Sequence, residues 1–275
     1  MSRNLVLTGL VITCGTARVA AGQCPGAGTA RLGAIAGAYA AGETAALLIR
    51  HHDWWPDSAR RLNFTWGGSP SANQDGFLHA SIAYQAAQGA TLAFDWACMS
   101  PVAAGWLGAL TGIAIALPKE VGDGFHGTGF SGSDMLATTA GAVLPALHRA
   151  LPPLRAVNLK VTYWPSAEWR NRTGAQPHLE TDYAGQRFFL TFSPGLLPGG
   201  SGPWPRWLGA GVGHGTPGWV TAPAIDDWYL TLDLNVRGLP ITGRTWRAIA
   251  ALIDQIHIPL PGVRLRGGSV TAGLY

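Results

Sequence analysis

The chain has 275 residues and a formal net charge of +4, with only 12% charged residues, 38 glycines and 12 tryptophans. Globular domains usually carry about 25% charged residues, so this composition excludes a disordered chain and argues against a coiled coil or an ordinary cytosolic enzyme. The basic residues are scattered singly or in pairs, which predicts no nucleic-acid partner. A protein of a membrane or cell envelope remains.

The first 24 residues have the pattern of a signal peptide, with a retained N-terminal anchor as the alternative. Arg3 provides a positive start, residues 5–13 are apolar, and Val19-Ala20-Ala21 fits the small-x-small cleavage rule. Gln23 precedes Cys24 where a lipidated cysteine would have Gly, Ala or Ser, so lipidation at this cysteine is the less favoured alternative. We therefore expect a membrane-associated protein of the bacterial envelope, in the periplasm or outer membrane.

Residues 25–155 are rich in Ala, Gly and Leu and predict a bundle of about four helices. The helices are expected at 29–50, 74–96, 101–118 and 131–150. The third contains no charge over its 18 residues, which is the threshold length for crossing a bilayer. It could equally be the central helix of a soluble bundle. The Gly108-x-x-x-Gly112 spacing would permit close helix contact.

Residues 156–275 change to a period of two and predict an antiparallel β region. Alternation is clearest at 228–236, where Leu230, Leu232 and Leu234 share one face, and the chain ends in a strand candidate at 263–275. An amphipathic helix is expected at 244–257. We predict that the leucine face packs on that helix or on the bundle, giving an open sheet outside the bilayer; a lipid-facing barrel is the alternative. The fold class is α+β, with domains at 1–24, 25–155 and 156–275.

Residues that could carry chemistry gather between 75 and 134. Asp75 and His79 are four apart and share a helix face, while Glu120, Asp123 and Asp134 follow the uncharged segment. If the helices form a bundle, we expect His79, Glu120 and Asp134 to converge within about one water-bridged contact. Carboxylates with an imidazole suit zinc, manganese or magnesium, and equally suit acid–base chemistry.

Each of these residues also has a structural interpretation. Ser131-x-x-Asp134 fits an N-terminal helix cap, Asp75 could be another N-cap, and Glu120 could be a solvated helix end. His79 could be a core histidine paired with Asp75. The Gly209–Gly215 run lacks the G-x-G-x-x-G spacing and its βαβ setting, so we predict no nucleotide partner.

The same residues carry a resemblance to a known family. Asp75-x-x-x-His79, then Lys119-Glu120-x-x-Asp123-Gly, then Phe130-Ser131-x-x-Asp134 resembles the YfiM-like family of predicted periplasmic lipoproteins, and is more distantly similar to VanZ-like membrane proteins. The strand half resembles the longer YfiM-like members. This chain has Gly76, Gly132 and Thr138 where that family usually has Lys, Trp and Asn. The family has no established activity, so the resemblance implies location and architecture.

Two functional hypotheses follow. The first is a non-enzymatic envelope protein whose Asp75/His79/Glu120/Asp134 network ties the helices together. The second is a metal-dependent enzyme or binder acting on an envelope lipid or glycan, with His79 and the nearby carboxylates, Asp123 included, as working groups. The expected partners are membrane lipid or other envelope components, and a divalent metal is the only cofactor candidate, under the second hypothesis.

Overall fold

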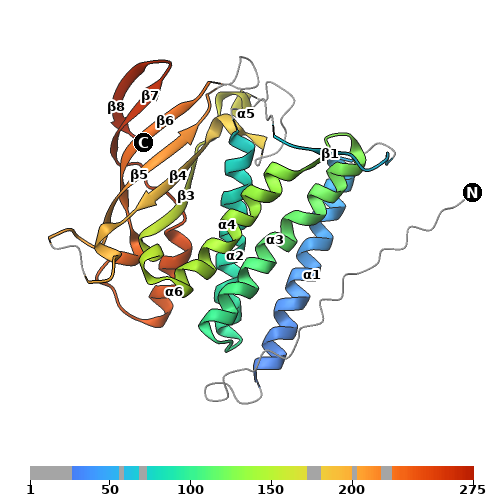
Figure 1. Cartoon of the computed structure of the whole chain (residues 1–275), viewed down its shortest axis with the longest axis horizontal. Coiled ribbons are helices and arrows are strands. Elements are labelled where there is room, and N and C mark those ends of the chain that lie inside the picture. The colour runs from blue at the N-terminus through green and yellow to red at the C-terminus, as the bar shows by residue number, and fades with distance from the viewer. Residues whose placement is uncertain (1–26, 56–58, 68–72, 172–180, 200–202, 218–224) are drawn as a thin grey trace, which may run out of the picture.

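The computed structural model describes residues 27–55, 59–67, 73–171, 181–199, 203–217 and 225–275. It confirms the α+β class: helices come first and an antiparallel sheet follows, with the two parts side by side (Figure 1). The predicted signal peptide and Cys24 lie outside the described residues. Cys98 is disulfide-bonded. Cys14, like Cys24, lies outside the described residues.

The helical half consists of α1 (Ala27–Asp53), α2 (Gln74–Trp96), α3 (Pro101–His126) and α4 (Gly132–Ala150). α2, α3 and α4 pack together through very small residues. A Cβ added at Gly112 would lie 2.7 Å from the Ala83 carbonyl oxygen, and one at Gly141 would lie 1.9 Å from the Ala80 carbonyl oxygen. The glycines therefore set how closely the three helices approach, as the Gly108-x-x-x-Gly112 spacing indicated.

α3 is longer than the sequence predicted. Pro118 was expected to end it, yet the helix continues through this proline to His126. Gly122 and Gly124 make room for neighbours beyond that point, because a Cβ on Gly122 would lie 2.1 Å from the Trp55 ring. Packing of Trp55 and Leu62 against these glycines thus holds the extra two turns, and the acidic residues expected after the helix lie within it.

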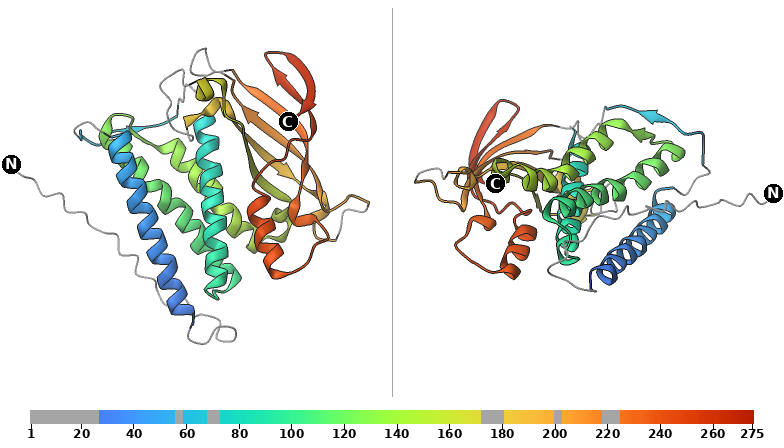
Figure 2. Two further views of the ribbon diagram at one scale, coloured as in Figure 1. Left: turned by 180° about the vertical axis from the view of Figure 1, so that it is seen from behind. Right: turned by 60° about the horizontal axis from the view of Figure 1, so that its bottom comes forward.

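Two helices are long and apolar enough to cross a membrane: Gly28–Asp53 within α1, and α3. α1 lies at the periphery of the bundle (Figure 2), and its apolar window has no buried residue, whereas 28% of the α3 window is buried. The exposed large apolar residues of α3 recur at helical spacing on one stripe, which comprises Val102, Trp106, Leu110, Leu117 and Val121. Two helices therefore present apolar surface outward, where one was expected.

The second half is built on a six-stranded antiparallel meander in the order β3-β4-β5-β6-β7-β8. The strands are β3 (Val157–Tyr163), β4 (Gln186–Phe192), β5 (Leu208–Gly215), β6 (Asp227–Leu234), β7 (Pro261–Arg266) and β8 (Ser269–Leu274). β1 (Phe64–Thr65) and β2 (Phe130–Ser131) form a separate parallel pair beside the bundle.

Short elements complete the described fold. These are α5 (Ala167–Asn171), α6 (Arg244–Ile253), and the 3₁₀ turns η1 (Pro152–Ala156), η3 (Tyr183–Gly185), η4 (Pro194–Leu196) and η5 (Val236–Gly238). α6 corresponds to the amphipathic helix expected at 244–257. The predicted terminal strand at 263–275 was wrong, because Gly267 and Gly268 both adopt positive φ and turn the chain into the β7–β8 hairpin.

The prediction for the leucine face was also wrong. Along β6, Tyr229, Thr231 and Asp233 are buried, while Leu230 is 54% exposed and Leu232 is 39% exposed. The open sheet was correctly predicted, but its two faces are reversed. Alternation shows that a strand has two different faces; it does not show which one the rest of the chain covers.

The buried face of the sheet holds a group of ionic side chains, here called the closed cluster: Lys160, Asp233, Asp254 and His257. Lys160 Nζ lies 2.9 Å from both Asp233 Oδ2 and Asp254 Oδ1. His257 Nδ1 lies 3.1 Å from Asp233 Oδ1, and the His257 ring stacks on Phe189. All four side chains are at most 1% exposed, so α6 and the segment leading to β7 seal this face with ion pairs at its centre.

Candidate functional site

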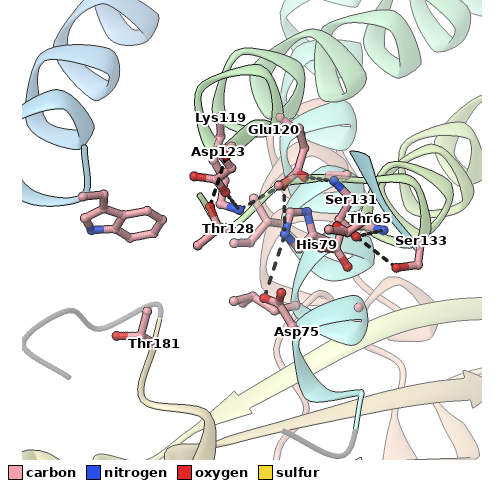
Figure 3. A pocket seen from close by; sticks show the side chains of 18 of the residues that line it. Thr65, Asp75, His79, Lys119, Glu120, Asp123, Thr128, Ser131, Ser133 and Thr181 are labelled. Carbon is pink, nitrogen blue, oxygen red and sulfur yellow. Dashed lines mark hydrogen bonds and ion pairs between the residues drawn. The ribbon is translucent and has the colours of Figure 1, made fainter. Parts of the chain in front are cut away.

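A cavity of about 820 Å³ opens where the N-terminal turns of α2 and α4 meet the C-terminal part of α3. Its wall contains all five residues that the sequence singled out: Asp75, His79, Glu120, Asp123 and Asp134. Figure 3 shows Asp75, His79, Glu120 and Ser131 pointing toward one another from these elements. The helix packing described above therefore brings Asp75 of α2 close to Asp134 of α4, which is 59 positions further along the chain.

His79 lies at the centre of this site and is 8% exposed. Its Nδ1 forms a 3.2 Å hydrogen bond with Thr138 Oγ1 on α4. Its Nε2 lies 3.9 Å from Asp75 Oδ1 and 3.6 Å from Glu120 Oε1, and both distances exceed hydrogen-bond length. One ring nitrogen is thus anchored on protein, while the other faces carboxylates at a distance that leaves it available.

Asp75, His79 and Asp134 form the part of the site that could hold a metal ion. Each offers one ligand atom, and the three atoms lie within 4.8 Å of one another. The Tyr183 hydroxyl donates a 2.6 Å hydrogen bond to Asp75 Oδ1, which orients that carboxylate from outside the group. An imidazole anchored through its other nitrogen and two oriented carboxylates resemble the arrangement of open metal sites.

Lys119, Glu120 and Asp123 form a second part, in which the protein itself satisfies the charges. Lys119 Nζ donates to Glu120 Oε1 at 3.0 Å and to Asp123 Oδ2 at 2.8 Å. Trp55 Nε1 donates to Asp123 Oδ1 at 2.8 Å, and the Ser131 main-chain N–H donates to Glu120 Oε2 at 3.1 Å. Glu120 is only 1% exposed, so it is not the solvated helix end considered from the sequence.

Asp134 combines a capping position with an unusual electrostatic setting. Ser131 Oγ accepts a 3.3 Å hydrogen bond from the Asp134 main-chain N–H, which confirms the predicted cap of α4. Burial raises the pKa of the Asp134 carboxyl above its ordinary value; Ser131 opposes this shift, and Asp75 adds to it. The carboxylate form would therefore gain from a nearby positive charge.

The expected convergence of His79, Glu120 and Asp134 is confirmed by these distances. Asp75 is not the N-cap of α2, because Asn73 takes that position and Asp75 lies in the first turn. Sequence reasoning missed Trp55 and Tyr183, which orient Asp123 and Asp75. Both lie far along the chain from their partners, and no spacing rule connects them.

The glycine-rich run at 209–215 has a structural role. It forms β5, and a Cβ added at Gly213 would lie 2.4 Å from the Phe189 ring. The alternate glycines of the run leave room for side chains on the buried face of the sheet. The run is thus a strand, and the loop that a phosphate-binding motif requires is absent from this described segment.

No family model, curated protein or solved structure matches this chain. The chemistry of the site is therefore argued from its own residues.

Proposed function

We propose that this chain is a membrane-associated protein of the bacterial cell envelope that holds a divalent cation between Asp75, His79 and Asp134. Two apolar helices support membrane association. The disulfide at Cys98 supports an oxidising compartment. The resemblance to YfiM-like proteins points to the same location.

The observation that carries the metal site is the division of the polar cluster into two parts. If the cluster were wholly structural, as the first hypothesis holds, each charge would be matched within the protein, as it is for Glu120 and Asp123. Instead, the three potential ligand atoms of Asp75, His79 and Asp134 face one another at the wall of the cavity. A cation would neutralise the two carboxylates and use the available nitrogen of His79. A histidine with two carboxylates suits zinc or manganese and, less strongly, magnesium.

Metal-dependent stability tests this proposal. Protein stripped with a chelator is titrated with zinc, manganese or magnesium chloride, and unfolding is followed by circular dichroism. A cation at one hundred times its dissociation constant should stabilise the folded state by about 2.7 kcal/mol. His79→Gln and Asp134→Asn should abolish that gain. His52→Gln is the matched control, because the His52 side chain is 88% exposed. An equal gain in wild type and both site variants would refute the metal site.

The cavity favours a second, wider function, in which the metal site acts on an envelope lipid or glycan. Its volume of about 820 Å³ far exceeds the roughly 30 Å³ of one water molecule. Its wall joins the polar cluster to apolar residues of α2 and α3, such as Ile82 and Ile115, which suits an amphiphilic molecule.

Incubation of metal-loaded protein with extracted envelope lipids, followed by mass spectrometry, tests this function. A lipid species that is bound or converted by wild type and not by Asp134→Asn would support it. If the metal binds and no lipid is retained or changed, the metal site would stand without this second function.

A further inference from the structure

One side of the sheet carries exposed apolar residues along its central strands, while Phe188 and His214 at one end of that side are buried against Phe77 of α2. Cross-strand partners share a face of a sheet, and Leu190 pairs with Val212, which pairs with Leu230, while Phe192 and Leu232 both pair with Ala210. We call this surface the apolar sheet face: Leu190, Phe192, Val212, Leu230 and Leu232. These five side chains are between 39% and 54% exposed. Folding in water normally covers such a face.

The polarity of the sheet is inverted relative to that of a soluble protein. Along the described strands β3 to β8, no Asp, Glu, Lys or Arg occupies a position on the exposed side. The opposite side contains the closed cluster, including the ion pair between Lys160 and Asp233. Apolar side chains outward and polar ones inward are the arrangement of a strand that faces lipid.

Exposed tryptophans lie at both ends of the sheet. Trp164 follows β3 and Trp228 is the second residue of β6 at one end, while Trp204 and Trp207 precede β5 at the other. The register places Trp228 on the side of the apolar sheet face. They are between 39% and 69% exposed. β5 and β6 each have eight residues, or about 26 Å at 3.3 Å per residue. Transmembrane β-barrels, whose strands are tilted by about 35–45°, have an outward apolar band about 25 Å tall between two aromatic girdles.

The sheet packs on α2, and α1 and α3, the two helices that could cross a membrane, lie on the other side of α2 (Figures 1 and 2). β4 and β5 are paired along both edges, so their main-chain groups are already bonded, as hydrocarbon requires. The central strands could therefore meet lipid without exposing unpaired backbone.

We propose that the apolar sheet face contacts the acyl chains of a lipid bilayer, with the tryptophans at its two ends near the headgroups. This inference rests on the proposed membrane association and extends it from the helices to the sheet. In this arrangement lipid covers the apolar sheet face. The closed cluster lies on the opposite, buried side of the sheet and provides its polar interior.

Spin labels in vesicles test this contact. Leu230→Cys and, as a second position, Leu190→Cys are labelled with a nitroxide and reconstituted in phosphatidylethanolamine and phosphatidylglycerol vesicles. Wild type, which has no introduced cysteine, is treated with the same nitroxide reagent and measures the background signal from the native cysteines. Ile241→Cys is the matched control, because Ile241 is 51% exposed and lies beyond the end of β6.

Lipid contact predicts frequent collisions with oxygen at Leu230 and Leu190, with a loss of nickel-chelate collisions relative to Ile241. Nickel-chelate access equal to that of Ile241 would place the face in water and refute the inference. Low access to both reagents would show contact with a second copy or another protein, and would also refute it. If the wild-type protein does not float with the vesicles, membrane association itself fails; flotation with nickel-accessible labels refutes the sheet contact alone.

Discussion

The closed cluster on the buried face of the sheet and the polar residues at the cavity use the same types of side chain in opposite ways. The latter are here called the cavity cluster and comprise Asp75, His79, Lys119, Glu120, Asp123 and Asp134. Under the sheet, Lys160 is paired with two aspartates and is 1% exposed. In the bundle, Lys119 pairs with Glu120 and Asp123, and Asp75, His79 and Asp134 are left facing a cavity. Residue type alone therefore does not separate a structural network from a binding site; what separates them is whether the protein supplies a partner for each charge.

The matching of charges in the closed cluster extends beyond its own members. Asp254 accepts hydrogen bonds from Asn158 Nδ2 at 2.7 Å, from the Val236 main-chain N–H at 2.7 Å and from Arg237 Nε at 2.8 Å. The Tyr84 hydroxyl of α2 donates to Asn158, and burial raises the pKa of Tyr84 to about 12. The closed cluster thus joins the bundle to the sheet, whereas the cavity cluster has one side open.

Breaking the closed cluster should have the largest effect on stability. Lys160→Met leaves Asp233 and Asp254 buried without their shared ammonium group, and removal of one partner of a buried pair costs about 3–5 kcal/mol. Chemical denaturation measures this loss. Arg149→Met is the control, because its partner Asp95 is 32% exposed and such a pair contributes about 1 kcal/mol or less. Equal losses in the two variants would contradict the assignment of a sealed ionic core.

Acid should weaken the junction between the two regions. His148 Nε2 of α4 donates to the Val157 carbonyl oxygen of β3 at 2.9 Å. Burial, with smaller effects from Arg237 and Arg155, lowers the pKa of His148 to about 4. The unfolded chain binds a proton at the ordinary pKa of about 6.5, so stability is present above that pH and is lost as pH falls from about 6.5 to 4, by up to about 3 kcal/mol.

Unfolding free energies of wild type and His148→Gln across this pH range test the prediction. Gln retains a donor for the Val157 carbonyl oxygen and does not titrate. The unfolding free energy of His148→Gln should therefore fall by about 3 kcal/mol less than that of wild type as pH decreases from about 6.5 to 4. Parallel curves would exclude His148 as the source of the acid sensitivity.

The helix packing that builds the cavity can be probed with two glycines. Gly141→Ala would place a Cβ 1.9 Å from the Ala80 carbonyl oxygen, and such overpacking costs about 1–3 kcal/mol. Gly89→Ala in α2 meets nothing within 4 Å and should stabilise the helix by up to about 1 kcal/mol. Thermal unfolding of both variants checks the opposite signs; two stabilised variants would mean that the α2–α4 contact is looser than described.

The smallest expected change is that of Asp134→Asn without metal. Burial raises the pKa of Asp134, and the Asp75 carboxylate adds to the shift, so removing this charge relieves repulsion. We expect the free energy of unfolding of metal-free Asp134→Asn to lie within about 1 kcal/mol of the wild-type value, in contrast to that of Lys160→Met. A loss comparable to that of Lys160→Met would show that the cavity cluster is structural after all, as the first hypothesis from the sequence stated.

The helical half was largely predictable because its signals are local. The expected bounds of α2 agree with the structure at both ends, and the cap at Ser131 was identified from its spacing to Asp134. The extension of α3 past Pro118 was missed, since it depends on Trp55 packing against Gly122 from a distant segment. Convergence of the site followed from the number of helices and the scarcity of charge elsewhere among them.

The sheet half was less predictable, because which face of each strand is buried depends on what the rest of the chain packs against it. The alternation of Leu230 and Asp233 defined two faces correctly, but the expectation that the leucine face covers α6 or the bundle assigned them the wrong way round. The strand β5 was missed because glycine has a low strand propensity, although here its lack of a side chain accommodates Phe189. A lysine and an aspartate at inward positions of two strands, Lys160 and Asp233, were the available signal for a polar interior.

The small residues between the helices have a consequence for the solvents in which the bundle can exist. Ala83, Ala87 and Ala142 form its buried apolar centre, with Gly112 against them. Such side chains bury little area each, so the bundle depends on close van der Waals contact of backbones more than on expulsion of water. Contacts of this kind operate in hydrocarbon, in detergent micelles and in water alike. The bundle can therefore keep its shape, and with it the spacing of Asp75, His79 and Asp134, when the protein is transferred from one medium to another.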